Sequence, residues 1–262
     1  MLKHLILTFL KTIKYYIIDL ILYFKKLIGI DHTILTLDSG EFLRIRNIDM
    51  IGISLLKGQQ FESVTREAIM SRVHDGMTVL DIGANIGYYT VQMAHKVGDK
   101  GNIIAFEPNP VMMAELQSSV RLNKFTNVIT EQVALSDSKG TAEFCIPETG
   151  KESHGSLKQN ITFTTRNQFN VQTDRLDDVL RRLNISKVDF IKIDVEGAEM
   201  LVFNGASNLL SGQYKPCIIF ESAEHLCKPF GFRVFDVLSY LNAYGYSIEQ
   251  FEYGMWLAQP IK

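Results

Sequence analysis

The sequence predicts an α/β protein built on one open, mostly parallel sheet with helices packed around it. Two observations predict this class. Short apolar runs typical of buried strands alternate along the chain with segments of helical spacing. One of these runs, residues 78–82, leads through a glycine turn directly into a helical pattern. In such sheets ligands bind beyond the carboxyl ends of the strands, so we expect the functional residues there.

Length and composition indicate one main domain. With 262 residues, 46% of them hydrophobic, the chain can bury one substantial core. A formal charge of −2 without a long basic run argues against nucleic acid as a partner and favours small or neutral substrates. Cys145, Cys217 and Cys227 are widely separated and lack metal-ligand spacing. We therefore expect reduced thiols and a cytoplasmic location.

Residues 1–30 are expected to form an amphipathic N-terminal helix. Their charged residues fall within about half of the helix circumference at about 100° per residue, which leaves a wide apolar face. A bilayer span needs about 20 apolar residues, and the longest run between lysines, residues 15–24, is shorter and contains Asp19. Asp19 and the lack of a small-residue cleavage site also argue against a signal peptide. Two interpretations remain: a peripheral membrane anchor through residues 1–28, and a helix docked on the domain or on a partner subunit.

Residues 31–60 are expected to form a β-hairpin and a linker, and residues 61–262 the main domain. The hairpin is indicated by two alternating segments around the turn that ends at Gly40. Residues 61–73 have helical spacing and stop at an Asp-Gly pair just before the strand at 78–82.

The glycine turn after this strand suits a small ligand that is cationic or carries hydroxyls. Gly83 and Gly87 permit positive φ and let a ligand lie directly against the backbone. Asp81, at the end of the strand, would repel phosphate. The turn reads Gly-Ala-Asn-Ile-Gly and lacks the G-x-G-x-x-G pattern, so an NAD-dependent oxidoreductase is the lesser alternative.

An acid also follows the second strand, residues 103–106. Glu107 lies 24 residues beyond Gly83. Dinucleotide folds place a carboxylate on a ribose diol at a separation of roughly 20 residues. Two prolines then begin a helix, so we expect Glu107 at the strand tip and not in a surface loop.

Residues 138–174 interrupt the alternation of strands and helices and are expected to form an inserted hairpin with a polar loop. His154 and Ser156 in that loop are candidate substrate contacts, because loops over the carboxyl edge of a sheet often confer specificity. A solvated histidine is the alternative for His154.

Two later strands also deliver acids to their tips. Residues 188–194 end in Asp194, and alternation places Lys192 on the same strand face, where we expect it to pair with acids. Glu196 lies in the following helical turn and is a further substrate candidate, although the helix dipole alone would favour an acid there. Residues 217–220 lead into Glu221, with His225 four residues on. A helix and a terminal strand pair then complete an antiparallel edge.

With these motifs the sequence resembles the FkbM-type family of class I S-adenosylmethionine-dependent methyltransferases. The resemblance rests on VLDIGANIGYYT, IIAFEPNP, VALSD, FIKIDVEGAE and IIFE, in that order, and covers roughly residues 61–221. It implies a Rossmann-like α/β fold: a seven-stranded, mostly parallel sheet with helices on both faces and an antiparallel edge strand.

The resemblance also implies a cofactor, S-adenosyl-L-methionine. The residues implied to bind it are Asp81, Gly83, Asn85, Gly87, Glu107, Ala134 and Asp194. Among them the glycine turn cradles the methionine portion, Glu107 takes the ribose diol, and Ala134 borders adenine.

The implied reaction is O-methylation of a sugar hydroxyl on a glycan or of another small hydroxylated metabolite. The sulfonium methyl group is already activated, so the protein must chiefly align the acceptor oxygen. Asp194 is our first choice of base, with Glu221 and His225 as orienting groups or alternative bases. The sequence leaves open a divalent metal at Asp194, for which it supplies too few ligands to assert a site. It also leaves open the oligomeric state. The alternative function is a catalytically inactive, membrane-tethered binding protein that keeps the fold.

Overall fold

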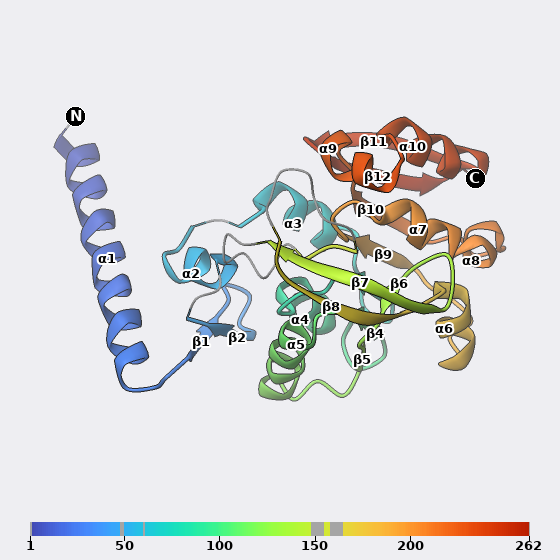
Figure 1. The fold of residues 1–262 in the computed structure, drawn as a ribbon. Helices are drawn as coiled ribbons and strands as arrows, with labels where there is room; N and C mark the ends of the chain where they lie inside the picture. Colours follow the sequence, from blue (N-terminus) through green and yellow to red (C-terminus); the bar gives the residue numbers. More distant parts are fainter. Residues whose placement is uncertain (1, 48–49, 60, 148–154, 158–164, 262) are drawn as a thin grey trace.

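Seven strands form the central sheet of the chain, for which a computed structural model describes residues 2–47, 50–59, 61–147, 155–157 and 165–261 (Figure 1). The strands are β3 (Thr78–Ile82), β4 (Asn102–Phe106), β5 (Val128–Glu131), β9 (Phe190–Ile193), β10 (Cys217–Glu221), β11 (Tyr246–Glu252) and β12 (Met255–Pro260). Their order in the sheet is β11-β12-β10-β9-β3-β4-β5.

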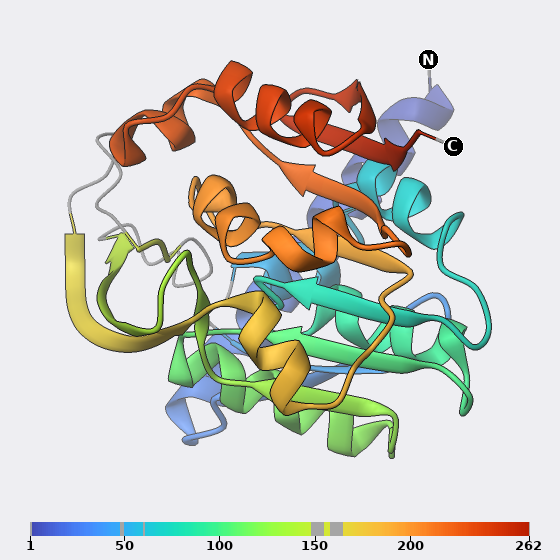
Figure 2. The same cartoon turned by 90° about the vertical axis from the view of Figure 1, so that its right-hand side faces the viewer.

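Most of this sheet is parallel. β10, β9, β3, β4 and β5 run in one direction, whereas β12 pairs antiparallel with both β10 and the outermost strand β11. Figure 2 shows this directly, because the arrow of β12 points against those of β10 and β3. The predicted class, a seven-stranded and mostly parallel sheet with an antiparallel edge, is confirmed.

β3 is the point where the chain reverses its direction of travel across the sheet. β4 and β5 follow on one side of β3, whereas β9 and β10 lie on the other. Such a reversal leaves a crevice outside the carboxyl ends of the central strands. The chain therefore has a site for a ligand where β3, β4 and β9 end.

Helices cover both faces of the sheet, because its strands are apolar on both sides. On one face Val79 and Ile103 pack in a cluster with residues of α3 (Ser63–Met70), α4 (Tyr88–Val97) and α5 (Pro110–Leu122). On the other, Leu80 and Ile104 pack with residues of α6 (Leu176–Arg182), α7 (Glu199–Asn204), α8 (Ser207–Ser211) and α10 (Val234–Ala243).

Three shorter elements lie N-terminal to this domain. β1 (His32–Thr36) and β2 (Phe42–Arg46) form an antiparallel pair, and α2 (Met50–Leu56) follows. The pair is held on α5, since the Arg44 guanidinium lies 2.8 Å from the buried Glu115 carboxylate. α1 (Leu2–Leu27) lies at one end of the molecule (Figure 1), and its Asp19 pairs with Lys57, just after α2, at 2.7 Å. Within the described residues, no helix combines the length and hydropathy needed to cross a membrane.

A second, three-stranded sheet lies beyond the carboxyl ends of the parallel strands (Figure 2). It consists of β6 (Ala134–Leu135), β8 (Thr165–Asp174) and β7 (Gly140–Pro147), with β7 and β8 antiparallel. Residues 155–157 return to it, because Ser156 and Cys145 exchange two backbone hydrogen bonds. Short α9 (Glu224–Cys227) and a 3-10 turn (Lys228–Phe230) follow β10.

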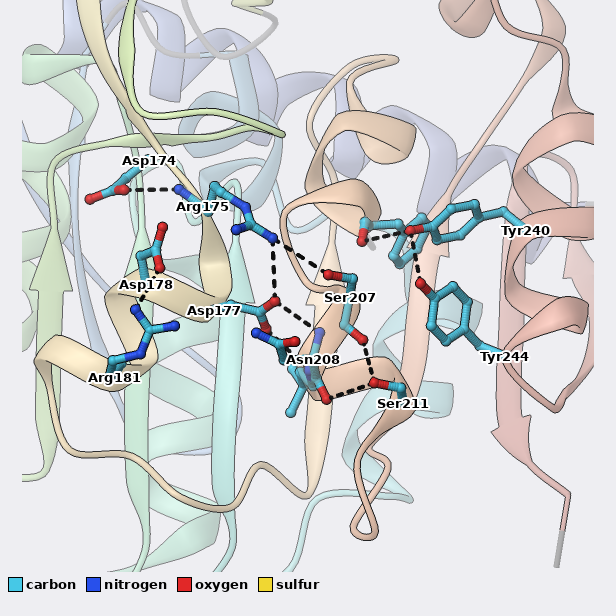
Figure 3. A network of polar contacts seen from close by, with 12 residues as sticks. Asp174, Arg175, Asp177, Asp178, Arg181, Ser207, Asn208, Ser211, Tyr240 and Tyr244 are labelled. Carbon is cyan, nitrogen blue, oxygen red and sulfur yellow. Dashed lines mark hydrogen bonds and ion pairs between the residues drawn. The ribbon is translucent and has the colours of Figure 1, made fainter.

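A polar network anchors α8 to α6, on the sheet face that these helices cover together with α7 and α10 (Figure 3). The buried Asp177 carboxylate accepts hydrogen bonds from the backbone N–H groups of Asn208, at 2.9 Å, and Leu209, at 3.1 Å. Arg175 lies 3.7 Å from the same carboxylate. Asp177 thus satisfies N–H groups that the first turn of α8 leaves without helical partners.

We expect Asp177→Ala to lower the free energy of unfolding by about 1–3 kcal/mol, because two amide N–H groups lose their acceptor. Urea denaturation measures this loss. Asp178→Ala is the matched control: Asp178 also lies on α6 but makes an exposed i,i+3 pair with Arg181, so its loss should stay below about 1 kcal/mol. Equal losses in the two variants would contradict the capping role of Asp177.

Candidate active site

A pocket opens where β3, β4 and β9 end. The space between its walls is about 630 Å³, counting the open mouth. Its polar lining comes from Gly83, Asn85, Glu107, Asp194 and Glu196. Its apolar lining includes Phe106, Met112, Ala134, Leu135, Phe144, Leu157 and Val195. The pocket therefore has an apolar part and a strongly acidic part.

The glycine turn shapes one wall of this pocket. Gly83 has a φ of 77°, and a Cβ atom there would lie 1.8 Å from the carbonyl oxygen of Asp194. Gly87 has a φ of 89°, and a Cβ atom there would lie 2.7 Å from Leu116 of α5. Gly83 lines the pocket, whereas Gly87 packs on α5 and is not among the lining residues. Both glycines are required by backbone conformation and by close packing.

Glu107 is the buried acid of the pocket. One carboxylate oxygen accepts a hydrogen bond from the N–H of Asn85 at 2.9 Å, and the other accepts one from the N–H of Asn109 at 2.8 Å. Burial raises the pKa of Glu107 to about 7, against the opposing effect of these two hydrogen bonds. Because each carboxylate oxygen can accept more than one hydrogen bond, Glu107 keeps free acceptor capacity.

A buried lysine joins the tips of β3 and β9. The Nζ of Lys192 donates to the carbonyl oxygen of Gly83 at 2.9 Å and lies 3.5 Å from Asp81 and 3.4 Å from Asp194. Burial opposes its charge, but the carboxylates of Asp194 and Asp81 prevail and raise its pKa above the ordinary value. Asp81 also accepts from Thr90 at 2.6 Å and is fully buried, so it supports the pocket wall without lining it.

Further acids surround Asp194. Burial first, and then the charge of Asp194, raise the pKa of Glu196 to about 8 and that of Glu221 to about 10. Glu62, in the left-handed position before α3, accepts a 2.7 Å hydrogen bond from Tyr89, and burial raises its pKa too. Within the described part of the chain, these acids do not form a group of three arranged to hold a metal ion.

The insertion closes one side of the pocket. Phe144 of β7 and Leu157 both line it, and the hydroxyl of Ser156 donates to the backbone carbonyl of Glu196 at 2.9 Å. The Ser156 side chain thus contacts the backbone of the loop that follows β9. His154, its partner among the predicted substrate contacts, lies outside the described residues.

Of the remaining predicted residues, some lie in or near the pocket and one lies at the surface. Ala134 lines the pocket, as does Asn85. Glu221 lies at the tip of β10, close enough for Asp194 to influence its pKa. His225, however, is exposed on α9 and is not among the residues that line the pocket. The structure thus groups Glu107, Asp194, Glu196 and Glu221 and leaves His225 at the surface.

Some lining residues escaped prediction. Met112 and Phe144 follow ordinary apolar patterns, which are equally typical of a core. Tyr89 lies in the predicted helix after the glycine turn, and only its contact with Glu62 shows that it supports the site. No local signal in the sequence distinguished these residues from structural ones.

The fold and this pocket agree with a methyltransferase, with the glycine turn after β3 and the acid after β4 at the switch point of the sheet. A family model described as the Methyltransferase FkbM domain matches residues 81–248, and the chain belongs to that family. The resemblance found in the sequence motifs is confirmed.

Several relatives are similar to this chain. Methyltransferase sdnD of Sordaria araneosa is 28% identical, over 60% of this chain and 73% of its own length. Hexuronic acid methyltransferase AglP of Haloferax volcanii is 28% identical, over 59% of each chain. 2-O-methyltransferase NoeI of Sinorhizobium fredii is 27% identical, over 51% of this chain and 58% of its own. The matches to AglP and NoeI cover less than two thirds of those relatives.

We expect Lys192→Met to lower the free energy of unfolding by about 3–5 kcal/mol at pH 7, because it leaves two carboxylates without their buried cation. The stabilisation that Lys192 provides should be fully present below pH about 10, the ordinary lysine value, since its pKa is raised in the folded chain. Denaturant titration tests this. Lys187→Met, which removes the exposed partner of Asp189, is the control and should leave stability unchanged. A Lys192→Met variant as stable as the wild type would contradict the bridging role.

Proposed function

We propose that the chain methylates a hydroxyl group of a glycan or of another small hydroxylated metabolite, with S-adenosylmethionine bound in the pocket at the ends of β3, β4 and β9. The observation that carries this proposal is Glu107. Its two carboxylate oxygens are fixed by backbone N–H groups, one each, and retain acceptor capacity at the pocket wall. A pair of adjacent hydroxyls, as on a ribose, matches a carboxylate held in this way.

The rest of the pocket fits the same ligand. Met112, Ala134 and Leu135 supply the apolar surface that a purine ring would need. Asp194 and Glu196 line the part of the pocket beside Gly83, and a carboxylate there complements a sulfonium or ammonium cation. Asp81 and Gly87 do not line the pocket but support its wall: Asp81 pairs with Lys192, and Gly87 packs on α5. The bound donor supplies an electrophilic methyl group, so the chain's own task is to place the acceptor and to receive its proton.

Asp194 is the base that this proposal favours. Its carboxylate is about one-third exposed and lies next to the Lys192 ammonium. Glu221 differs, because its raised pKa of about 10 keeps it protonated at neutral pH. A protonated carboxyl can donate a hydrogen bond to an acceptor but cannot take its proton. Glu221 therefore serves as an orienting group.

The class of acceptor is suggested by the relatives. AglP is named for a hexuronic acid and NoeI for 2-O-methylation, so both names point to sugar or hydroxyl chemistry in this family. The acidic lining of the pocket agrees with a hydroxyl acceptor, which carries no negative charge at the reacting atom.

Binding of S-adenosylmethionine should strengthen as pH rises from 6 to 8, by roughly tenfold, because Glu107 must lose a proton from a group with a pKa of about 7 to accept two hydroxyls. Isothermal titration calorimetry across this range measures the trend. Glu107→Gln keeps the shape but not the titration of this group, so its affinity should be lower and should lose most of the pH dependence; the remainder belongs to Glu196, whose pKa burial raises to about 8. A wild-type affinity that does not change, or that weakens with rising pH, would count against Glu107 as the ribose ligand.

Methyl transfer should fall about 10²–10⁴-fold in Asp194→Asn, the range in which a general base contributes. Glu221→Gln should keep most of the activity, because it replaces a neutral carboxyl by a neutral amide. The assay is transfer of radiolabel from S-adenosylmethionine to fractionated glycans and small metabolites. Label recovered in a methyl ether would support the proposal. Cofactor binding without transfer to any fraction would favour the alternative, a binding protein that keeps the fold.

A further inference from the structure

The helix α1 presents an apolar face that points away from the domain. Large hydrophobic side chains recur at helical spacing along it and are strongly exposed, among them Tyr16 at 77% and Phe9 at 65%. The members of this outer face are Phe9, Ile13, Tyr16, Leu20, Phe24 and Leu27. At about 100° per residue they fall within one sector of the helix. So continuous an exposed apolar surface marks a place where something else binds.

The opposite side of α1 faces the domain, which fixes the direction of the outer face. Tyr15, Ile18 and Leu22 are half-buried. Asp19 pairs with Lys57, just after α2, at 2.7 Å, and the Lys57 ammonium lies 5.8 Å from the Tyr15 ring centroid. These contacts hold the helix so that its outer face is turned away from the domain.

The charge of α1 differs in sign from that of the remaining chain. Residues 2–27 contain five lysines and one aspartate, a net charge of +4, whereas the whole chain carries −2 and the remainder therefore −6. The single aspartate is already paired with Lys57. Lys14 and Lys26 lie about 120° to either side of the centre of the outer face, whereas Lys11 lies opposite that centre. Long side chains in flanking positions reach around an apolar face toward a charged surface.

We propose that α1 lies in the plane of an anionic lipid bilayer, with its outer face among the acyl chains and its lysines at the phosphate groups. An apolar face flanked by lysines has the two attractions that hold such helices at membranes, buried apolar area and charge. The rest of the chain is acidic and faces water on the other side of α1. A second copy of α1 would bring more positive charge to the same face, whereas lipid phosphates neutralise it.

Vesicle flotation of the full chain tests this proposal. Vesicles of phosphatidylcholine with phosphatidylglycerol should carry the protein upward, and vesicles of phosphatidylcholine alone should carry much less. Raising the salt concentration should weaken binding, since screening reduces the lysine contribution.

Two variants separate the apolar and the charged contributions. The triple change Tyr16→Ser, Leu20→Ser and Phe24→Ser should abolish flotation, while Phe235→Ser with Tyr253→Ser, which alters exposed apolar residues of the domain, should not. Lys14→Glu with Lys26→Glu should weaken binding by at least the roughly fivefold per lysine expected near an anionic surface. The matched change of the exposed domain lysines, Lys100→Glu with Lys139→Glu, should leave binding nearly unchanged.

Two outcomes would overturn the proposal. One is a chain that does not float with anionic vesicles. The other is a dimer, seen by light scattering coupled to size-exclusion chromatography, that is lost in the triple serine variant while vesicle binding is unaffected; the outer face would then bind a second copy. Methyl transfer to a soluble acceptor should be equal in the triple serine variant and the wild type, so this test is independent of the proposed function.

Discussion

The ammonium group of Lys192 is the interaction on which the site depends. It lies in the interior of the sheet, joins the carboxylate at the end of β3 to the one after β9, and donates to the backbone of the glycine turn. Two segments far apart in the sequence, residues 81–83 and 192–194, are thereby held at one point. Without this cation, two neighbouring carboxylates in a buried region would repel each other, and one or both would have to take up a proton.

This constraint also explains how an acidic site is kept in order. Lys192 offsets the charge of Asp81 and Asp194, and the surrounding glutamates avoid charge because burial raises their pKa values. The result is a pocket with one partly exposed carboxylate, Asp194, beside Lys192 and several glutamates that remain partly or fully protonated at neutral pH. Such a separation of ionisation states lets neighbouring carboxyls act in different roles, one accepting a proton and another donating a hydrogen bond.

Much of this fold was predictable from the sequence because its strands are apolar on both faces. The continuous runs at 78–82, 103–106 and 217–220 could be recognised without knowledge of their partners, and the acids that follow them mark the same sheet edge. The pairing of Lys192 with acids followed from its position inside a buried strand. In each case the physical requirement is local to the strand and its tip.

The orientation of residues beyond the strand tips was harder to predict from the sequence. Four residues separate Glu221 from His225, and the turn into the short helix α9 places His225 at the surface. Asp81 and Gly87 both belong to the glycine-turn motif, yet Asp81 is enclosed by Thr90 and Lys192 and Gly87 packs on α5. These placements depend on how helices from distant parts of the chain pack on the turn, which no local pattern encodes.

A crystal structure with S-adenosylhomocysteine tests the role of Glu107 most directly. We expect both ribose hydroxyls within hydrogen-bond distance of Glu107 and the adenine beside Ala134. A nucleoside bound elsewhere, with Glu107 making only its two backbone contacts, would contradict this role.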